Sequence, residues 1–222
     1  MDKNSPERNY LLQRFNDVLQ KHVDDDSTRN EIFEEIEKKY SSNRRGYHNF
    51  NHIFYMVKLW DNYKDRLGKR DEIFISILYH DIVYNSKRSD NEERSAKYFI
   101  KHCLKYNFKF SHKQIKFIGD AILATKHNES VKHFYENDND IKYFLDFDLY
   151  VLSAEENVYE AYRQGVRKEY KIYPDFLYKP GRKKVLESFL QRDRIYLTDD
   201  IKTKRENFAR NNLQNEINLY LC

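Results

Sequence analysis

Glycine and proline are scarce in this chain, which has five glycines and three prolines among its 222 residues. Strand-rich folds need more of both, because hairpin turns call for residues that reach positive φ or hold φ fixed. The scarcity argues against an all-β protein. It is compatible with helices, whose interiors tolerate neither residue well.

Cysteine is rarer still, and Cys103 and Cys222 match no zinc-binding or disulfide spacing. No apolar run approaches the roughly 18 residues that span a bilayer, so we expect no membrane segment. The N-terminal stretch "MDKNSPERNYLL" contains no apolar core of a signal peptide. We therefore expect a reducing, cytoplasmic setting.

A large excess of one charge is also lacking, since 40 Lys and Arg residues against 36 Asp and Glu residues give a net charge of +4. This small excess suits an anionic ligand, but without a basic tract it argues against nucleic acid as a partner. What the chain does have is 40% hydrophobic, 16% aromatic and 34% charged residues. That composition predicts a globular protein with a packed interior and an ionic surface.

Apolar residues recur at helical spacing, for example at Ile115, Ile118 and Ile122. Four Ser or Thr residues are followed three positions later by Glu or Gln, which is the pattern of a capping box at a helix start. These pairs are Thr28 with Glu31, Ser89 with Glu92, Ser111 with Gln114, and Ser153 with Glu156. The combined signals predict helices over residues 6–22, 28–40, 47–66, 71–84, 90–106, 112–127, 139–150, 154–170, 175–191 and 199–219.

The expected fold class is therefore all-α, a single-domain helical bundle of about nine or ten helices over residues 1–222. Its core would comprise about residues 28–150, with the C-terminal helices of residues 154–219 packed on it. Gly181 is expected between helices and Pro180 at the entry to the ninth helix.

Side chains with metal-binding chemistry stand inside apolar segments at four positions: His52, the adjacent pair His80 and Asp81, and Asp148. An ionised aspartate is rarely buried unless it is paired or metal-bound, because removing its charge from water is costly. A lone helical histidine is usually an ordinary core residue, but the order His, His-Asp, Asp on three apolar helices is a stronger pattern. Two imidazoles and two carboxylates suit Mn²⁺, Fe²⁺, Co²⁺, Ni²⁺ or Zn²⁺ and leave room for water.

This order resembles the H…HD…D signature of the HD-domain superfamily of metal-dependent phosphohydrolases, which is an all-helical fold. The signature falls here on His52, His80, Asp81 and Asp148. In the family a leucine commonly follows the last aspartate by one or two places, and Leu149 does so here.

The resemblance extends over about residues 40–215, to the group of predicted HD-superfamily metal-dependent phosphohydrolases. It is carried by the segments "YHNFNH", "HDIVYNSKRSDNEERSA", "AILATKH", "FLDFDLYVLS" and "VRKEYKIYPDFLYKPGRKKVLESFLQRDRIY". It implies an HD-type bundle whose four signature residues hold a divalent ion of Mn, Fe, Co, Ni, Zn or Mg. It also implies hydrolysis of a small phosphorylated molecule, with nucleotides among the candidates, by a metal-activated water.

Four further residues are candidates for catalytic roles. In related HD hydrolases a carboxylate soon after the HD pair orients or deprotonates the water, and we favour Glu93 for this part. Glu92 could act instead, or could complete a capping box with Ser89, and both could be first-turn acids favoured by the helix dipole. His48 lies four residues before the first signature histidine, on the same helix face, and could contact substrate. Lys126 could bind phosphate or simply be solvated.

Phosphate binding also needs polar and cationic donors. We expect these substrate-binding residues to be Arg45, Asn49, Arg163 and Arg167. Arg163 and Arg167 are four residues apart and share a helix face. Each arginine could equally be an ordinary surface charge.

His127 ends an apolar segment and could hold a second metal ion, as extra histidines do in some HD proteins. His102 and His112 lie in Lys-rich segments and are expected to be exposed. Asp146 lies two residues before the last signature aspartate, so the two do not share a helix face. It could be a cap partner or a base that supports a ligand histidine.

Two other functions stay open at this point. A diiron oxygenase on the same scaffold would need additional histidine ligands, with His127 the first candidate. A non-catalytic module that binds metal or a nucleotide would keep the metal ligands without turnover. The sequence leaves open a homodimer and predicts no membrane partner.

Overall fold

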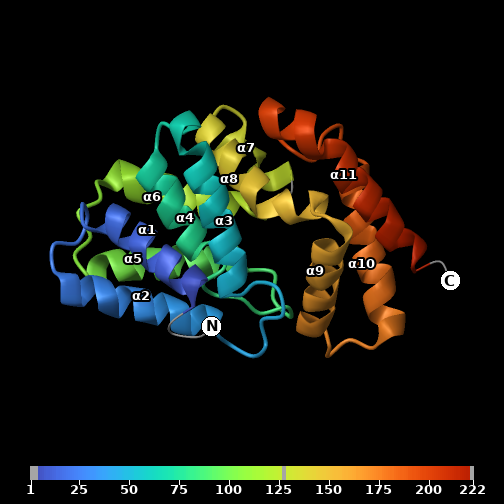
Figure 1. Cartoon of the computed structure of the whole chain (residues 1–222), viewed down its shortest axis with the longest axis horizontal. Helices are drawn as coiled ribbons and strands as arrows, with labels where there is room; N and C mark the ends of the chain where they lie inside the picture. The colour runs from blue at the N-terminus through green and yellow to red at the C-terminus, as the bar shows by residue number, and fades with distance from the viewer. Residues whose placement is uncertain (1–4, 127–128, 221–222) are drawn as a thin grey trace. The chain divides into compact units, whose positions relative to one another are not determined.

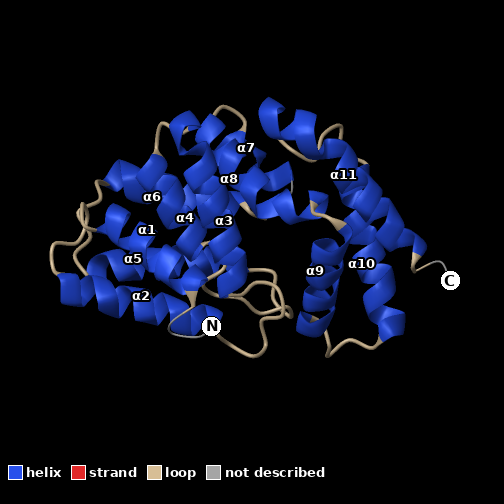
Figure 2. Cartoon of the chain, viewed as in Figure 1, coloured by secondary structure: helices blue, strands red, loops and turns tan. Residues whose placement is uncertain are grey.

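The computed structural model describes residues 5–126 and 129–220, and helices are the regular secondary structure throughout that part of the chain (Figure 1, Figure 2). No strand occurs among these described residues. The all-α prediction is therefore confirmed, while the HD type of the bundle stays a prediction. The helices form two compact units, Met1–Phe144 and Leu145–Cys222. That these units fold as one domain over residues 1–222 also stays a prediction.

The first unit is built mainly from helices, and some helices that pack against each other are not consecutive in the chain. Its elements are α1 (Pro6–Leu19), α2 (Asp26–Tyr40), α3 (Phe50–Tyr63), η1 (Lys64–Arg66), α4 (Arg70–Tyr79), α5 (Asn91–Lys105), α6 (His112–Ala124), η2 (Glu129–Val131), α7 (Lys132–Tyr135) and most of α8 (Asn139–Leu149). The short α7 has no counterpart in the sequence prediction. No helix in the described part is long and apolar enough to cross a membrane.

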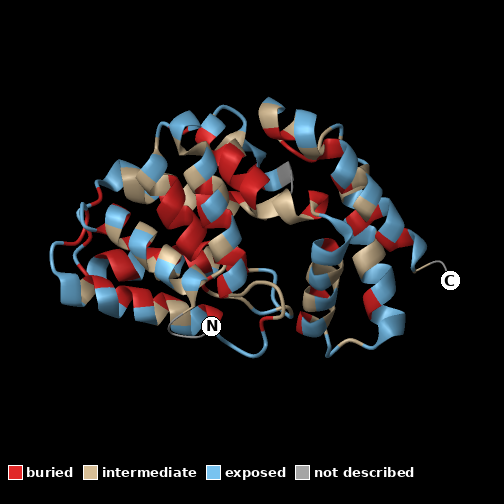
Figure 3. Ribbon diagram, viewed as in Figure 1, coloured by how far each residue is buried: buried red, intermediate tan, exposed pale blue. Residues whose placement is uncertain are grey.

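Helix α4 is the centre of this unit. It packs against α3, α5 and α6, and every residue from Ile73 to Tyr79 is buried (Figure 3). A helix that is apolar on all sides belongs in a core rather than on a surface. Phe74, for example, is fully buried and lies edge-on to Trp60 of α3, with 4.9 Å between ring centroids. The chain leaves this central helix at the His80–Asp81 pair, so the pair emerges from the middle of the core.

The predicted helices that carry His52 and the His80–Asp81 pair are both shorter than predicted. Helix α4 ends at Tyr79 rather than at residue 84, with His80 as its C-cap and Asp81 in the turn that follows. Helix α3 begins at Phe50 rather than at residue 47. The two candidate ligands of the HD pair are therefore not successive positions on a continuing helix, and the turn frees the aspartate from helical geometry.

Only one of the four predicted capping boxes forms. Ser111 accepts from the backbone N–H of Gln114, and the Gln114 side chain accepts from the Ser111 backbone N–H. Helix α2 is instead capped by Asp25, whose carboxylate accepts from the Thr28 backbone N–H at 2.6 Å. An aspartate is as good an N-cap as a serine and better than a threonine. The predicted boxes at Thr28, Ser89 and Ser153 are therefore wrong.

The second unit holds the end of α8 and the elements η3 (Tyr150–Ser153), α9 (Glu156–Glu169), α10 (Asp175–Leu190) and α11 (Asp199–Asn218). Helix α11 packs against α10 and η3. Pro180 and Gly181 lie inside α10, and not at its entry or between helices as predicted. The proline removes one helical hydrogen bond there. Arg182 follows it and pairs with the fully buried carboxylate of Glu216 on α11, at 2.9 Å.

Candidate metal centre

The first candidate ligand, His52, lies in the first turn of α3. Asn49 starts this helix by accepting from the Asn51 backbone N–H at 2.9 Å, and its amide donates to the Gly46 carbonyl at 3.1 Å. Both bonds fix the turn from which His52 points inward. The His52 side chain is only 5% exposed, so its ring nitrogens meet protein groups more than bulk water.

His80, at the end of α4, is held in one orientation by its own helix. Its Nδ1 lies 2.9 Å from the carbonyl oxygen of Ile77 and donates to it, because a carbonyl can only accept. In a neutral imidazole this bond leaves Nε2 with its lone pair, which is the form that binds a metal ion. His80 is 1% exposed, so this lone pair is presented inside the protein.

Three ligand atoms converge around this nitrogen. Nε2 of His80 lies 3.2 Å from Nε2 of His52 and 3.2 Å from Oδ2 of Asp81. All three ligand atoms fall within 4.8 Å of one another. Ligands about 2.0–2.1 Å from one ion are about 3.0 Å apart at octahedral angles and about 3.4 Å apart at tetrahedral angles. The two short separations lie between these values, so the group could hold one metal ion.

The chemistry of this donor set fits a first-row divalent ion. Two imidazole nitrogens and one carboxylate oxygen suit Zn, Fe, Mn, Co or Ni, and three protein ligands leave positions for water or substrate. The set contains no thiolate, which argues against a purely structural zinc site of the cysteine-rich kind. The identity of the ion stays a prediction.

Arg45 organises the backbone around the ligands. Its guanidinium donates to the carbonyl oxygens of His48 and Asp81, both at 2.8 Å, and of Ile82 at 3.1 Å. It also lies over the ring of Tyr40, 4.8 Å from the centroid. These contacts join the segment before α3 to the turn after α4. Arg45 therefore positions the backbone at the site. That it also contacts substrate stays a prediction.

His48 lies at the edge of the same group. Its Nε2 is 3.9 Å from Oδ2 of Asp81, and its ring stacks on Tyr84 with 4.4 Å between centroids. The ring is partly exposed, at 24% of its side-chain surface. It can therefore face both the candidate ligand and a molecule that enters from solvent.

Glu92, Glu93 and Lys126 have separate surroundings. Burial raises the pKa of Glu92, and the negative charge of Asp81 acts in the same direction. Burial also acts to raise the pKa of Glu93, but the hydrogen bond with Lys126, a backbone hydrogen bond and the charge of Lys126 together lower the pKa below the ordinary value. The bond between Glu93 and Lys126 in turn raises the pKa of Lys126. Glu92, with Asp81 among its main influences, is the better candidate for a carboxyl that acts beside the ligands.

The remaining predicted substrate residues have local partners. Asn49 caps α3, as described above. Arg163 binds both carboxylate oxygens of Glu160, at 2.7 and 2.8 Å. Arg167 binds Asp175 and the carbonyls of Tyr170 and Tyr173. Arg163 and Arg167 belong to the second unit, and their binding of substrate stays a prediction.

Asp148 lies in α8, in the part of that helix assigned to the second unit, and its place in the ligand set stays a prediction. His127 lies outside the described residues. Asp146 is fully buried and accepts from the backbone N–H groups of Leu197 and Thr198, at 2.6 and 2.8 Å. Burial raises its pKa to about 7. Of the two roles considered for Asp146, the cap partner is the one its contacts match, because Thr198 is the N-cap of α11.

One histidine prediction is wrong. His102 is 3% exposed, and not on the surface as its Lys-rich surroundings suggested. Its Nδ1 is hydrogen-bonded to the hydroxyl of Tyr79 at 3.0 Å, and its Nε2 lies 3.2 Å from Glu35. His112 is exposed, as predicted. The helical period could have found His102, because Ser95, Phe99 and His102 lie on the same buried face of α5.

Comparison with known proteins adds no assignment: no family model matches the chain, and no curated protein matches it either.

Proposed function

We propose that this chain is a metal-dependent phosphohydrolase that acts on a small phosphate ester, with nucleotides as the first class to test. The observation that supports this most is the convergence of His52, His80 and Asp81, with the His80 tautomer set by its bond to Ile77. Two buried imidazoles beside a half-buried carboxylate are a donor set that suits a divalent first-row metal ion. The likeness of the sequence to HD-domain phosphohydrolases supports the reaction class.

His52, His80 and Asp81 would hold the ion, with Asp148 as the predicted fourth ligand. When bound, a divalent ion supplies Lewis acidity toward a phosphoryl oxygen and an attacking water. The bond between His80 and Ile77 keeps the ring oriented, with Nε2 toward His52 and Asp81. Arg45 keeps the backbone of Asp81 in place relative to the segment that carries His48.

The half-buried carboxyl of Glu92 would take or give the proton that hydrolysis moves. Its raised pKa suits this work, because a general base is most effective when its pKa lies close to the working pH. His48 would contact the substrate, since it is partly exposed and lies next to Asp81. Lys126 would supply positive charge to the phosphate while it also remains paired with Glu93.

A phosphate-release screen tests this proposal. Purified protein would be assayed with nucleotides and small phosphate esters in the presence of Mn²⁺, Co²⁺, Ni²⁺ or Mg²⁺. We expect turnover with at least one ion, and we expect His80→Ala to reduce it by more than about a hundredfold, as loss of a metal ligand should. His112→Ala changes an exposed histidine of α6 and serves as the matched control, with activity kept within twofold.

Other outcomes would assign a different function. Full metal occupancy without turnover on any phosphate ester would contradict the proposal and favour a non-catalytic binding module. Two ions per chain, of which one is lost in His127→Ala, would favour the diiron oxygenase.

A further inference from the structure

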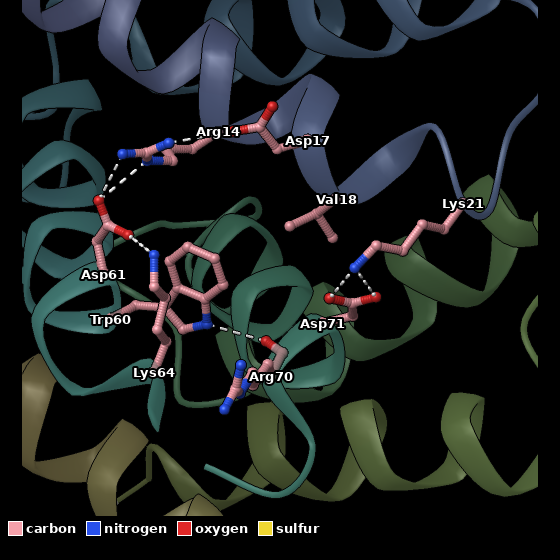
Figure 4. Close-up of a pocket in the computed structure, with 9 residues that line it drawn as sticks. All are labelled: Arg14, Asp17, Val18, Lys21, Trp60, Asp61, Lys64, Arg70 and Asp71. Atoms are coloured by element: carbon pink, nitrogen blue, oxygen red, sulfur yellow. Dashed lines mark hydrogen bonds and ion pairs between the residues drawn. The ribbon is translucent and has the colours of Figure 1, made fainter. Parts of the chain in front are cut away.

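A cavity lined by charged and apolar side chains lies in the first unit, away from the candidate metal centre. Its walls come from α1, the end of α3, η1 and the start of α4 (Figure 4). The lining residues are Arg14, Asp17, Val18, Lys21, Trp60, Asp61, Lys64, Arg70 and Asp71. Trp60 follows His52 by eight residues on α3, which places it about 12 Å further along the helix axis. This cavity is therefore not part of the metal centre.

The cations around the cavity are held in place by carboxylates. Asp61 accepts from Arg14 at 2.8 Å, from Lys64 at 2.6 Å and from the hydroxyl of Tyr10 at 2.8 Å. Burial alone would raise the pKa of Asp61, but the bonds from Lys64 and Tyr10 and the charge of Arg14 lower it. Asp61 therefore stays ionised and orients two cations toward the cavity.

A second carboxylate does the same on the other side of the cavity. Both oxygens of Asp71 accept from Lys21, at 3.0 and 3.1 Å, and one of them also lies 3.3 Å from Nε2 of His22. Figure 4 shows Val18 and Trp60 between the Asp61 group and the Asp71 group. Apolar Val18 and Trp60 thus line the cavity between two groups of charged side chains.

The hydrogen-bonding capacity that is left favours an anion. Lysine has three donors and arginine five, so each cation can bind another acceptor while it keeps its carboxylate. The oxygens of Asp61 and Asp71 already accept from several donors. Four cations against three carboxylates also leave the lining with a positive charge. A cationic ligand would find few acceptors here, whereas an anion would find donors.

The start of α4 already has an anionic partner. The carboxylate of Asp140 accepts from the backbone N–H groups of Gly68 and Lys69, at 3.0 and 2.7 Å. Arg70 and Asp71, the first two helical residues, line the cavity. An anion in the cavity would therefore be bound by the cationic side chains rather than by the helix N-terminus.

The size of the cavity limits the ligand. Its volume is about 220 Å³, below the roughly 300–1,000 Å³ of sites for drug-sized ligands. Ion pairs of exposed lysines such as Lys21 and Lys64 contribute only about 0–1 kcal/mol each, so an anion with several charged oxygens can recruit these two cations. We propose that this cavity binds a small phosphate or diphosphate anion, at a site separate from the metal centre and independent of the proposed catalytic function.

Trp60 is the only tryptophan in the chain and therefore reports on this cavity. The full-length protein would be titrated with sodium phosphate and, separately, sodium pyrophosphate, and its intrinsic fluorescence followed against sodium chloride of equal ionic strength. We expect a saturable change with at least one of the two phosphate anions and none with chloride. The absence of any saturable change would overturn the proposal.

Two double variants show whether the anion binds in this cavity. Lys21→Gln with Lys64→Gln should raise the Kd about tenfold, which corresponds to about 1.4 kcal/mol. Lys109→Gln with Lys116→Gln removes the same charge from two exposed, ion-paired lysines outside the cavity and should change the Kd less than twofold. Equal weakening in both double variants would show general attraction to charge and contradict the proposal.

His80→Ala separates this site from the metal centre. We expect the fluorescence titration to be unchanged in this variant, because the cavity contains none of the candidate ligands. Loss of the response in His80→Ala would place the anion at the metal centre and overturn the cavity site. The proposed phosphohydrolase activity could fail without affecting this result, since the titration needs neither metal nor turnover.

Discussion

At the scale of single residues, Arg45 shows how a side chain expected to bind substrate can serve the site in another way. Its guanidinium joins the carbonyls of His48, Asp81 and Ile82. Loss of a group that orients metal ligands typically weakens metal binding by about 10–100-fold.

Replacement of Arg45 by lysine tests this role. A lysine ammonium cannot donate to three carbonyls in the planar arrangement of a guanidinium. We expect Arg45→Lys to weaken binding of the ion by about 10–100-fold, measured by metal titration at constant pH. Arg44→Lys changes the exposed neighbour and should leave the affinity unaltered. Equal affinity of the two variants would show that the three carbonyl contacts do not support the site.

Glu35 gives a second prediction at this scale. Burial acts to raise its pKa, but hydrogen bonds from Tyr106, Lys105 and Tyr98 lower the pKa to about 2. A carboxylate whose pKa is lower in the folded than in the unfolded state stabilises the fold above its unfolded pKa, which is about 4.5 for Glu35. That contribution is lost as the pH falls from about 4.5 to about 2.

Chemical denaturation across this pH range checks the assignment. We expect the stability of the wild-type protein to fall more steeply between pH 4.5 and pH 2 than that of Glu35→Gln. Glu34→Gln replaces an exposed neighbour on α2 and should follow the wild-type curve. If Glu35→Gln retains the full wild-type slope, Glu35 is not the source of the acid sensitivity.

At the scale of elements, α4 lies at the centre of the first unit and ends at the His80–Asp81 pair. Its buried residues run without interruption from Ile73 to Tyr79. A cavity in the middle of this helix should therefore destabilise the whole first unit. Phe74→Ala should lower the free energy of unfolding by about 3–5 kcal/mol. Phe208→Ala removes the same atoms at a position that is 60% exposed and should cost within about 0.5 kcal/mol. Denaturant unfolding of both variants gives the comparison, and similar costs would contradict the central place of α4.

The elements also show what the sequence could and could not predict. The helices were predicted from apolar periodicity, and most of their predicted starts and ends lie within a few residues of the observed ones. The end of α4 could not be predicted, because no glycine or proline stands at residues 80–84. The carbonyls of Asp81 and Ile82 turn instead to Arg45, which is distant in sequence.

The candidate site, too, could be predicted only in part from the sequence. Its ligands His52, His80 and Asp81 were predicted from residue type and order, and the structure brings these three together. The bond from His80 to Ile77 and the stacking of His48 on Tyr84 depend on side-chain directions after a helix end, which no local pattern gives. His102 was misplaced because its lysine neighbours outweighed its place in the helical period.

At the scale of the whole molecule, the fold consists of two compact units, and the three converging ligands belong to the first. Binding of an ion there should stabilise the folded chain, because unfolding separates ligands from α3 and from the turn after α4. A ligand present at a hundred times its Kd adds about 2.7 kcal/mol to the free energy of unfolding. We therefore expect the Tm to rise on addition of Mn²⁺ or Zn²⁺ and to fall again with a chelator, measured by calorimetry. An unchanged Tm at saturating metal would contradict an ion held by native structure.

The most direct test of the central claim is the metal content of the purified protein, measured by elemental analysis beside His52→Ala, His80→Ala and the exposed-histidine control His112→Ala. The account predicts about one divalent ion per chain in the wild-type protein and in His112→Ala, and loss of that ion in the other two variants, with the helical circular dichroism of all four alike. A full ion in folded His80→Ala, or no ion in the wild-type protein after incubation with each candidate metal, would contradict it.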